Sequence, residues 1–141
     1  MEILRYIIVF FTVGWGCGII EAILFVLIIP LICLLRGTTA RGGVVAVSNG
    51  VATLLALYLA HLACSWTGGQ ATLLMFGIAF WALLSNDLRR IKRAKGGIIL
   101  GRIVEDENFR VGMVQTEKMN LIADVVGFSA GLALIPRLEF M

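Results

Sequence analysis

The chain has 141 residues, of which 60% are apolar and only 15% are charged, and its mean hydropathy is +0.96. An average soluble domain carries about 25% charged residues, and a domain of this size could not bury so much apolar surface. The composition therefore excludes a soluble enzyme, a disordered tail and a secreted disulfide scaffold. It predicts an all-α integral membrane protein that forms a single polytopic domain over residues 1–141.

The charge is unevenly placed along the chain. Residues 1–88 hold three basic and three acidic residues, whereas residues 89–141 hold nine basic and six acidic residues, and together they give the net charge of +3. A local excess of this kind indicates membrane orientation before it indicates affinity for nucleic acid, which is not an expected partner. The cysteines, Cys17, Cys33 and Cys64, lie far apart in apolar runs, and we expect buried thiols rather than a redox pair or a metal site.

The first apolar segment covers residues 6–35 and contains Glu21 as its one charged residue. A helix of this length would be about 45 Å long, against a hydrocarbon core of about 30 Å. We expect one long span that is tilted, or kinked at Pro30. A re-entrant pair of half-helices that breaks near residues 14–18 is an alternative. A cleaved signal peptide is a further one, which the length of the run and the lack of an A-x-A site disfavour.

The next 45 residues, 42–86, contain no charged residue, which is too long for one span. The sequence SWTGGQ at 65–70 marks a turn because of its glycine pair. We therefore expect a tight hairpin of two helices, over about 44–64 and 71–85.

Basic residues flank this hairpin at both ends. Arg36 and Arg41 lie in the polar turn before it, and a longer basic run follows it. The positive-inside rule places both ends, including the loop 87–102, in the cytoplasm and the 65–70 turn outside. The N-terminus is then outside if the first segment is one span. No organelle-targeting presequence precedes that segment, so we expect a prokaryotic cell (inner) membrane. The residues of the run are candidates for contact with anionic lipid headgroups or with a partner: Arg89, Arg90, Lys92, Arg93 and Lys95.

The sequence pattern changes after the basic run. Residues 96–116 have the pattern of two short strands around an acidic turn at 106–108, a small cytoplasmic β-hairpin. The alternative is a helix that continues the third segment, against which three glycines argue. The fourth segment, 119–135, contains Asp124 and would be about 25 Å long as a helix. We expect it to span, with a surface-lying or re-entrant helix as the alternative.

Small residues recur at helical spacing in three segments. In the second segment every fourth residue is small, and these residues form a ridge: Ser48, Ala52, Ala56, Ala60 and Cys64. The pairs Gly14-x-x-x-Gly18 and Gly127-x-x-x-Gly131 have the same four-residue spacing of small residues. Such faces let helix backbones approach closely. The pattern leaves open whether the neighbour belongs to the same chain or to another.

Two acidic residues are the candidates for an ion or proton pathway, because a carboxylate within a span is costly and often functional. They are Glu21 and Asp124. Alternatively, Glu21 pairs with a basic group of another chain or lies in contact with water. Asp124 could instead face lipid headgroups or cap a helix. His61 is the sole histidine, so haem would need a second ligand from another chain, and the residues do not suit zinc. There is no phosphate-binding loop, nucleophile elbow or Ser/His/Asp set. We expect no enzyme activity, no cofactor and no metal.

One stretch has a family resemblance. Leu35-Arg36-Gly37, six further residues and then Val44–Val47, set between two apolar segments, resemble the first loop of the small three-span subunits of Mrp-type cation/proton antiporters. The resemblance covers residues 25–90 at most and implies a subunit of an ion-translocating complex. That family's loop usually carries proline and acidic residues where this chain has Thr38, Gly43 and Ser48, so no functional residue is carried over.

The sequence thus predicts a non-enzymatic membrane protein that assembles laterally through its small-residue helix faces, with its own copies or as a subunit of a larger membrane complex. An ion- or proton-translocating subunit that uses Glu21 is one alternative. A self-assembling pore or filament protein, holin-like or pilin-like, is the other. Two acidic residues within apolar segments are few for a transporter that works alone.

Overall fold

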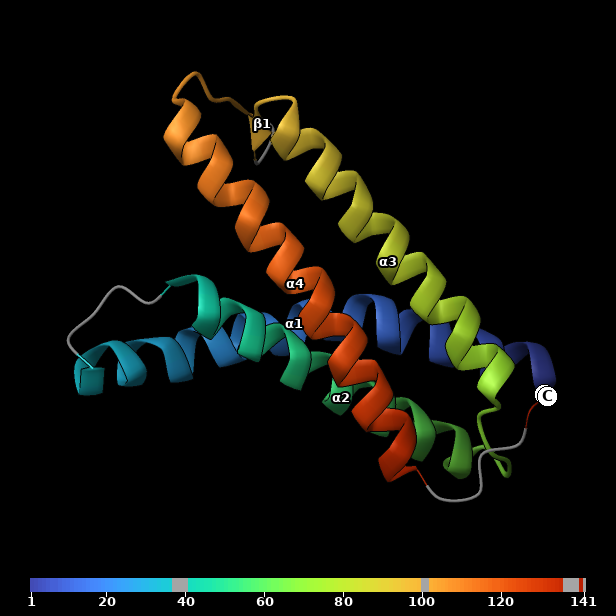
Figure 1. Cartoon of the computed structure of the whole chain (residues 1–141). Coiled ribbons are helices and arrows are strands. Elements are labelled where there is room, and N and C mark those ends of the chain that lie inside the picture. The colour runs from blue at the N-terminus through green and yellow to red at the C-terminus, as the bar shows by residue number, and fades with distance from the viewer. Residues whose placement is uncertain (37–40, 100–101, 136–139, 141) are drawn as a thin grey trace.

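The computed structural model describes residues 1–36, 41–99, 102–135 and 140. Over these residues the chain forms four helices and one antiparallel pair of two-residue strands. The helices are α1 (Glu2–Arg36), α2 (Arg41–Trp66), α3 (Leu73–Lys95) and α4 (Glu107–Leu134), and the strands are β1 (Ile98–Ile99) and β2 (Arg102–Ile103) (Figure 1). The predicted helical architecture is confirmed. Residues 37–40 of the predicted polar turn, Pro136-Arg137 and the side chain of Cys33 lie outside the described part of the chain.

Two of the helices are long and apolar enough to cross a membrane by length and composition: α1 over Glu2–Leu24 and α2 over Ala46–Trp66. α1 continues as one helix through Pro30. The predicted third and fourth spans lie in α3 and α4, which are longer than predicted and carry charged residues. α3 extends ten residues beyond position 85 into the basic run, and α4 begins twelve residues before position 119.

The turn predicted at 65–70 separates α2 from α3. Gly68 adopts the left-handed conformation (φ +85°) that its missing side chain permits. The Gly69 amide donates to the carbonyl of Cys64, which closes the last turn of α2. The hydroxyl of Thr72 then accepts from the Met75 amide at 3.3 Å and caps α3.

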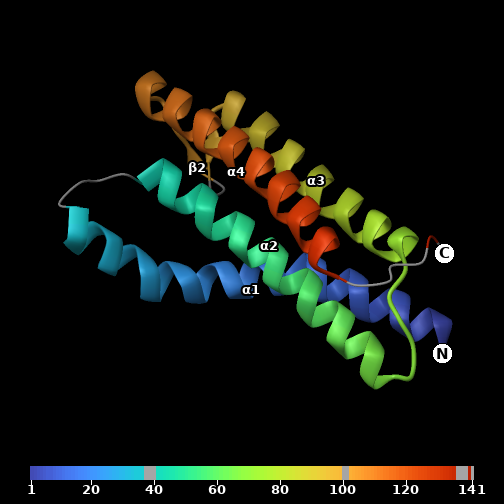
Figure 2. The ribbon, with the colours of Figure 1, turned by 60° about the horizontal axis from the view of Figure 1, so that its bottom comes forward.

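The two helices joined by this turn diverge instead of forming the predicted tight hairpin. α2 packs on α1 and α4, and α3 packs on α1 and α4 as well (Figure 1). Figure 2 shows α2 lying between α1 and α4. The reason is in the side chains: α2 has small residues on the faces that meet α1 and α4, as described below, so its close neighbours are these two helices.

The predicted strand pair around an acidic turn at 106–108 is wrong in the position of its turn, and its predicted second strand is not formed. The strands are only Ile98–Ile99 and Arg102–Ile103, and residues 109–116 are helical. Asp106 does not turn a hairpin but caps α4, since its carboxylate accepts from the Asn108 amide at 3.1 Å. The alternative, a helix that continues through this region from the third segment, is also wrong, because Gly97 leaves the helical conformation with φ +82°.

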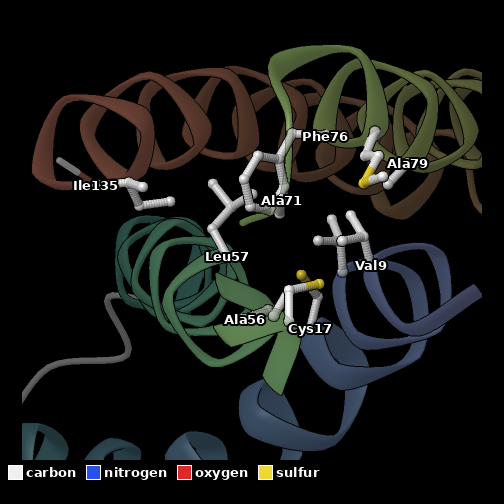
Figure 3. Close-up of a cluster of buried hydrophobic side chains, with 12 residues drawn as sticks. Val9, Cys17, Ala56, Leu57, Ala71, Phe76, Ala79 and Ile135 are labelled. Atoms are coloured by element: carbon white, nitrogen blue, oxygen red, sulfur yellow. The ribbon is translucent and has the colours of Figure 1, made fainter. Parts of the chain in front are cut away.

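The apolar core lies where the α3 N-terminus and the α4 C-terminus cross α1 and α2. It is built from small and medium side chains of all these elements, including Val9, Leu57, Phe76, Ala79 and Ile135 (Figure 3). The outer face of α1 is apolar and exposed along its length, with Phe10, Trp15 and Ile19 as examples. A surface of this kind is suited to contact with lipid.

Candidate ion- or proton-binding site

A cluster of polar side chains, which we call the carboxyl cluster, lies where the four helices meet. Each helix contributes to it: Cys17 and Glu21 from α1, Asn49 and Thr53 from α2, Asp87 from α3, and Asn120 and Asp124 from α4. All but Glu21, which is half-buried, are buried. Polar groups buried at this depth are costly unless they are paired, so their pairing decides what the cluster can do.

Thr53 and Asp124 form the closest contact of the cluster. Both are fully buried, and the Thr53 hydroxyl donates to Oδ1 of Asp124 at 2.7 Å. The same hydroxyl lies 3.0 Å from the backbone carbonyl of Asn49, which it can reach instead. A hydroxyl has one proton to donate and two lone pairs with which to accept. Thr53 can therefore donate to an ionised Asp124, or accept from a protonated Asp124 and donate to Asn49.

Asp87 brings a second carboxyl group to Asp124. Asp87 is only 3% exposed, and its carboxyl lies within hydrogen-bonding reach of Asp124. Oδ2 of Asp87 and Oδ2 of Asp124 are both buried without a hydrogen-bond partner among the described residues. Asp87 lies beyond the predicted segment 71–85 and outside both candidate spans. Its burial raises its pKa to about 8, and the hydrogen bond and the negative charge of Asp124 act in the same direction. The two carboxyl groups can be held together if they keep a proton between them.

Glu21 extends the cluster by one helical turn. The Cys17 thiol lies 3.9 Å from the Thr53 hydroxyl. Glu21 is four residues after Cys17 and so lies on the same face of α1. The charges that act on Glu21 are those of Asp124, Glu117 and Arg90. Three acidic groups from two helices and one exposed cation from a third thus share this end of the cluster.

The neighbouring turn on α2 and α4 is also polar. The side-chain amide of Asn49 donates to the backbone carbonyl of Asn120 at 3.4 Å. Oδ1 of Asn120 and Oε2 of the half-buried Glu117 are buried without a partner in the described structure. The cluster therefore continues from Asp124 toward Glu117 along α4 as a row of incompletely paired oxygen atoms.

The ridge of small residues predicted over 48–64 lies in α2, and we call it the α2 ridge; it packs within the chain. All five of its residues are buried (Ser48, Ala52, Ala56, Ala60 and Cys64). Both glycines of the pair in α4 lie against α2: a methyl group on Gly127 would overlap the backbone of Gly50, and one on Gly131 would lie 2.6 Å from Leu57 Cδ1. Of the two neighbours that the sequence left open, the structure supplies the one in the same chain. The close approach of α2 and α4 also brings Thr53 to Asp124.

The first glycine pair differs from this ridge. Gly14 is half-buried and Gly18 is exposed, and neither has a described heavy atom of another residue near the place that a Cβ atom would take. This part of α1 is thus open on the surface of the chain.

The basic residues of the predicted headgroup contact are all exposed, and none forms an ion pair within the described part of the chain (Arg89, Arg90, Lys92, Arg93 and Lys95). His61 is partly buried near the end of α2, and its Nδ1 atom has no partner among the described residues.

Sequence reasoning found Glu21 and Asp124 but missed the residues that join them. Asp87 begins the basic run and was assigned to the loop with it. A signal was present in the polar pairs Asn49/Thr53 and Asn120/Asp124, each spaced by four residues in an otherwise apolar helix. Two such pairs on separate helices are typical of faces that meet.

Over the described ranges, no group of three or more His, Cys, Asp or Glu side chains is arranged to hold a metal ion. The chemistry that the cluster offers is that of two buried carboxyl groups, a hydroxyl with two alternative partners and a third carboxyl group one turn away. Comparison with protein-family models, with curated proteins and with solved structures gives no match to this chain.

Proposed function

We propose that this chain is a helical membrane protein that translocates protons through the carboxyl cluster. The observation that carries the proposal is the pair Asp87–Asp124, two carboxyl groups buried together with unpartnered oxygens. Buried ionisable groups in membrane helices are costly and are retained at proton relays and ion pathways. A purely structural core would be more stable with apolar residues at these positions.

The hydrogen bonds around Thr53 support a site that changes its protonation state. Thr53 stabilises the ionised Asp124 by donating to it, and it stabilises the protonated Asp124 by turning its hydroxyl to Asn49. Neither state then leaves the Thr53 hydroxyl proton unpaired, so a proton can enter and leave without repacking the core. Glu21 is proposed as the next proton carrier, since it is less buried than Asp124 and lies one helical turn beyond Cys17 on α1.

The proposal includes a membrane arrangement. α1 and α2 cross the bilayer, and the apolar halves of α3 and α4 complete the bundle, which makes three to four membrane helices. Of the predicted basic loop 87–102, Asp87 lies buried at the inner end of the bundle, and the exposed basic residues from Arg89 on lie in the cytoplasm. The membrane is that of a prokaryotic cell. Labelling of single cysteines introduced at exposed positions on the 65–70 turn and on the loop 87–102, with a reagent that does not cross membranes, tests this orientation.

Proton flux tests the function. The purified chain is reconstituted in liposomes that contain a pH-sensitive dye, and a potassium gradient with valinomycin drives proton entry. The substitutions Asp124→Asn, Asp87→Asn and Glu21→Gln each remove one carrier, and Glu105→Gln is the matched control, because Glu105 is exposed and outside the cluster. We expect a loss of about tenfold or more in the three cluster variants, because a positioned side chain that transfers a proton contributes at least that much to rate, and no change in the control. Flux that survives all three substitutions, or wild-type flux equal to that of empty liposomes, contradicts the proposal.

Lateral assembly is a second candidate, favoured by the open surface around Gly14 and Gly18. Since the α2 ridge is buried within the chain, the proposed contact lies on α1, with copies of this chain or with other membrane subunits. Native mass spectrometry of the chain in nanodiscs, with Gly14→Leu and Gly18→Leu as variants, tests it. A closed oligomer that these variants dissociate supports assembly through α1, and an open-ended series would favour the pore or filament alternative. A wild-type monomer contradicts self-assembly.

A further inference from the structure

We infer that the end of α3 and the β1–β2 hairpin form a foot that docks on the surface of an anionic bilayer. The foot comprises the described residues 89–99, 102 and 103. It borders the carboxyl cluster at Arg90, but its contact with lipid is independent of the proposed proton pathway. In Figures 1 and 2 it lies with the start of α4 at the far end of the α3–α4 pair, away from the turn that joins α2 to α3.

The last two turns of α3 have a basic outer face and an apolar inner face. Ile91 and Ala94 are buried and hold the helix to the rest of the chain. Every basic side chain of this stretch is exposed: Arg89, Arg90, Lys92, Arg93 and Lys95. No described acidic residue lies within ion-pair distance of any of them. An unneutralised basic face of this density attracts anionic lipid, and each basic residue near the surface strengthens binding about fivefold.

The hairpin adds an apolar tip to this basic face. Ile98 and Ile103 are directly paired across β1 and β2, which places both side chains on one side of the ribbon. They are 45% and 84% exposed. Lys95 precedes the pair and Arg102 lies beside it, and both are exposed. Large aliphatic side chains between cations are typical of segments that insert shallowly at the headgroup level while the cations meet phosphate.

The acidic residues that follow the foot form no ion pair with it in the described structure. Asp106 caps α4, Glu107 lies 3.7 Å from Arg110 of its own helix, and Glu105 is exposed. The six basic residues of the foot therefore lack ion-pair partners within the described chain, and the bilayer that α1 and α2 are proposed to cross supplies a complementary surface.

The strand pair itself provides the measurement. A pair of two-residue strands is marginal in water, so its amides should exchange rapidly with solvent unless a surface holds it. Hydrogen exchange of residues 97–104 is measured by mass spectrometry on the full chain, in nanodiscs of phosphatidylcholine and in nanodiscs that also contain phosphatidylglycerol. We expect exchange about fivefold slower or more with phosphatidylglycerol, and we expect the protection to disappear at about 1 M salt, where the Debye length is about 3 Å.

Matched variants identify the contact. Lys92→Glu with Arg93→Glu removes the basic face, and Ile103→Asp removes the apolar tip; both should abolish the lipid-dependent protection. Lys118→Glu reverses one exposed cation of α4 outside the foot and should retain it. Unchanged exchange of the α2 amides shows that a variant is folded, and the lipid and salt comparisons on the wild type stand without any variant.

The outcomes are distinct. Equal exchange in the two lipids, or lipid-dependent protection that survives both foot variants, overturns the inference. Equal protection by soluble heparin in phosphatidylcholine nanodiscs also overturns it, because the foot would then bind polyanions in general. None of these results depends on proton flux, so the proposed function can fail while the foot is retained, and the reverse.

Discussion

The sharpest prediction concerns Gly127, where α4 approaches α2 most closely. Replacing this glycine by alanine places a methyl group on the backbone of Gly50, which cannot move as a flexible side chain would. Overpacking of this kind costs about 1–3 kcal/mol. Alanine also favours the helix over glycine by about 1 kcal/mol. The packing term is the larger, so we expect Gly127→Ala to destabilise the bundle by up to about 2 kcal/mol.

Gly112→Ala on the same helix isolates the packing term. Gly112 is exposed and has no described atom near its missing Cβ, so this variant gains helix propensity without a clash. The difference in free energy of unfolding between the two variants is then about 1–3 kcal/mol. Thermal unfolding in detergent micelles, followed by far-UV circular dichroism, measures it, and each kcal/mol should move Tm by several degrees, about 2–8 °C. A Gly127→Ala protein as stable as the Gly112→Ala protein would show that α2 and α4 do not meet at Gly50.

Three further predictions concern stability. Because the pKa of Asp87 is raised on folding, its carboxyl group stays protonated in the folded protein at pH values where it is ionised in the unfolded chain. The free energy of unfolding should therefore fall as pH rises from 3.8 to about 8 and then level off. Asp87→Asn should flatten this dependence in pH-resolved melting, and a wild type as stable at pH 8 as at pH 4 would contradict it. Thr53→Val leaves Oδ1 of Asp124 without its donor and should cost about 1–3 kcal/mol, whereas Thr53→Ser should retain most of the stability; equal melting of the two would refute the hydrogen bond. Phe80→Leu removes the stacking on Phe128, whose ring centroid is 3.9 Å away. The free energy of unfolding should fall by about 0.5–1.5 kcal/mol beyond the effect of the lost buried apolar area. A double-mutant cycle with Phe128→Leu measures this as the coupling energy between the two rings.

Much of the helical architecture followed from the sequence. Runs of uncharged residues and the glycine pair at 68–69 located α1, α2 and the turn before α3, because apolar length and turn chemistry are local properties. The region after Lys95 was less predictable. Residues 109–113 place Phe109, Val111 and Met113 at every second position, as a strand does, and the cap at Asp106 and the packing of α4 on α3 accompany the helix that forms instead.

The carboxyl cluster could be predicted only in part, since it depends on which helix faces meet. Glu21 and Asp124 stood out as charges within apolar segments. That Asp87 joins them depends on the crossing of α3 and α4, which no local pattern specifies. The residues of the α2 ridge are buried within the chain, but small residues do not identify the neighbouring helix.

The divergence of α2 and α3 has a consequence for the order in which the chain is built. The α1 face of α2, at Gly16 and Ala56, finds its neighbour as soon as α2 is synthesised. Thr53, which also lies 3.9 Å from the Cys17 thiol of α1, gains its partner Asp124 only 71 residues later. Until α4 has been synthesised, the first two helices therefore have one finished interface, and the polar side chains of α2 that contact α4 lack these partners.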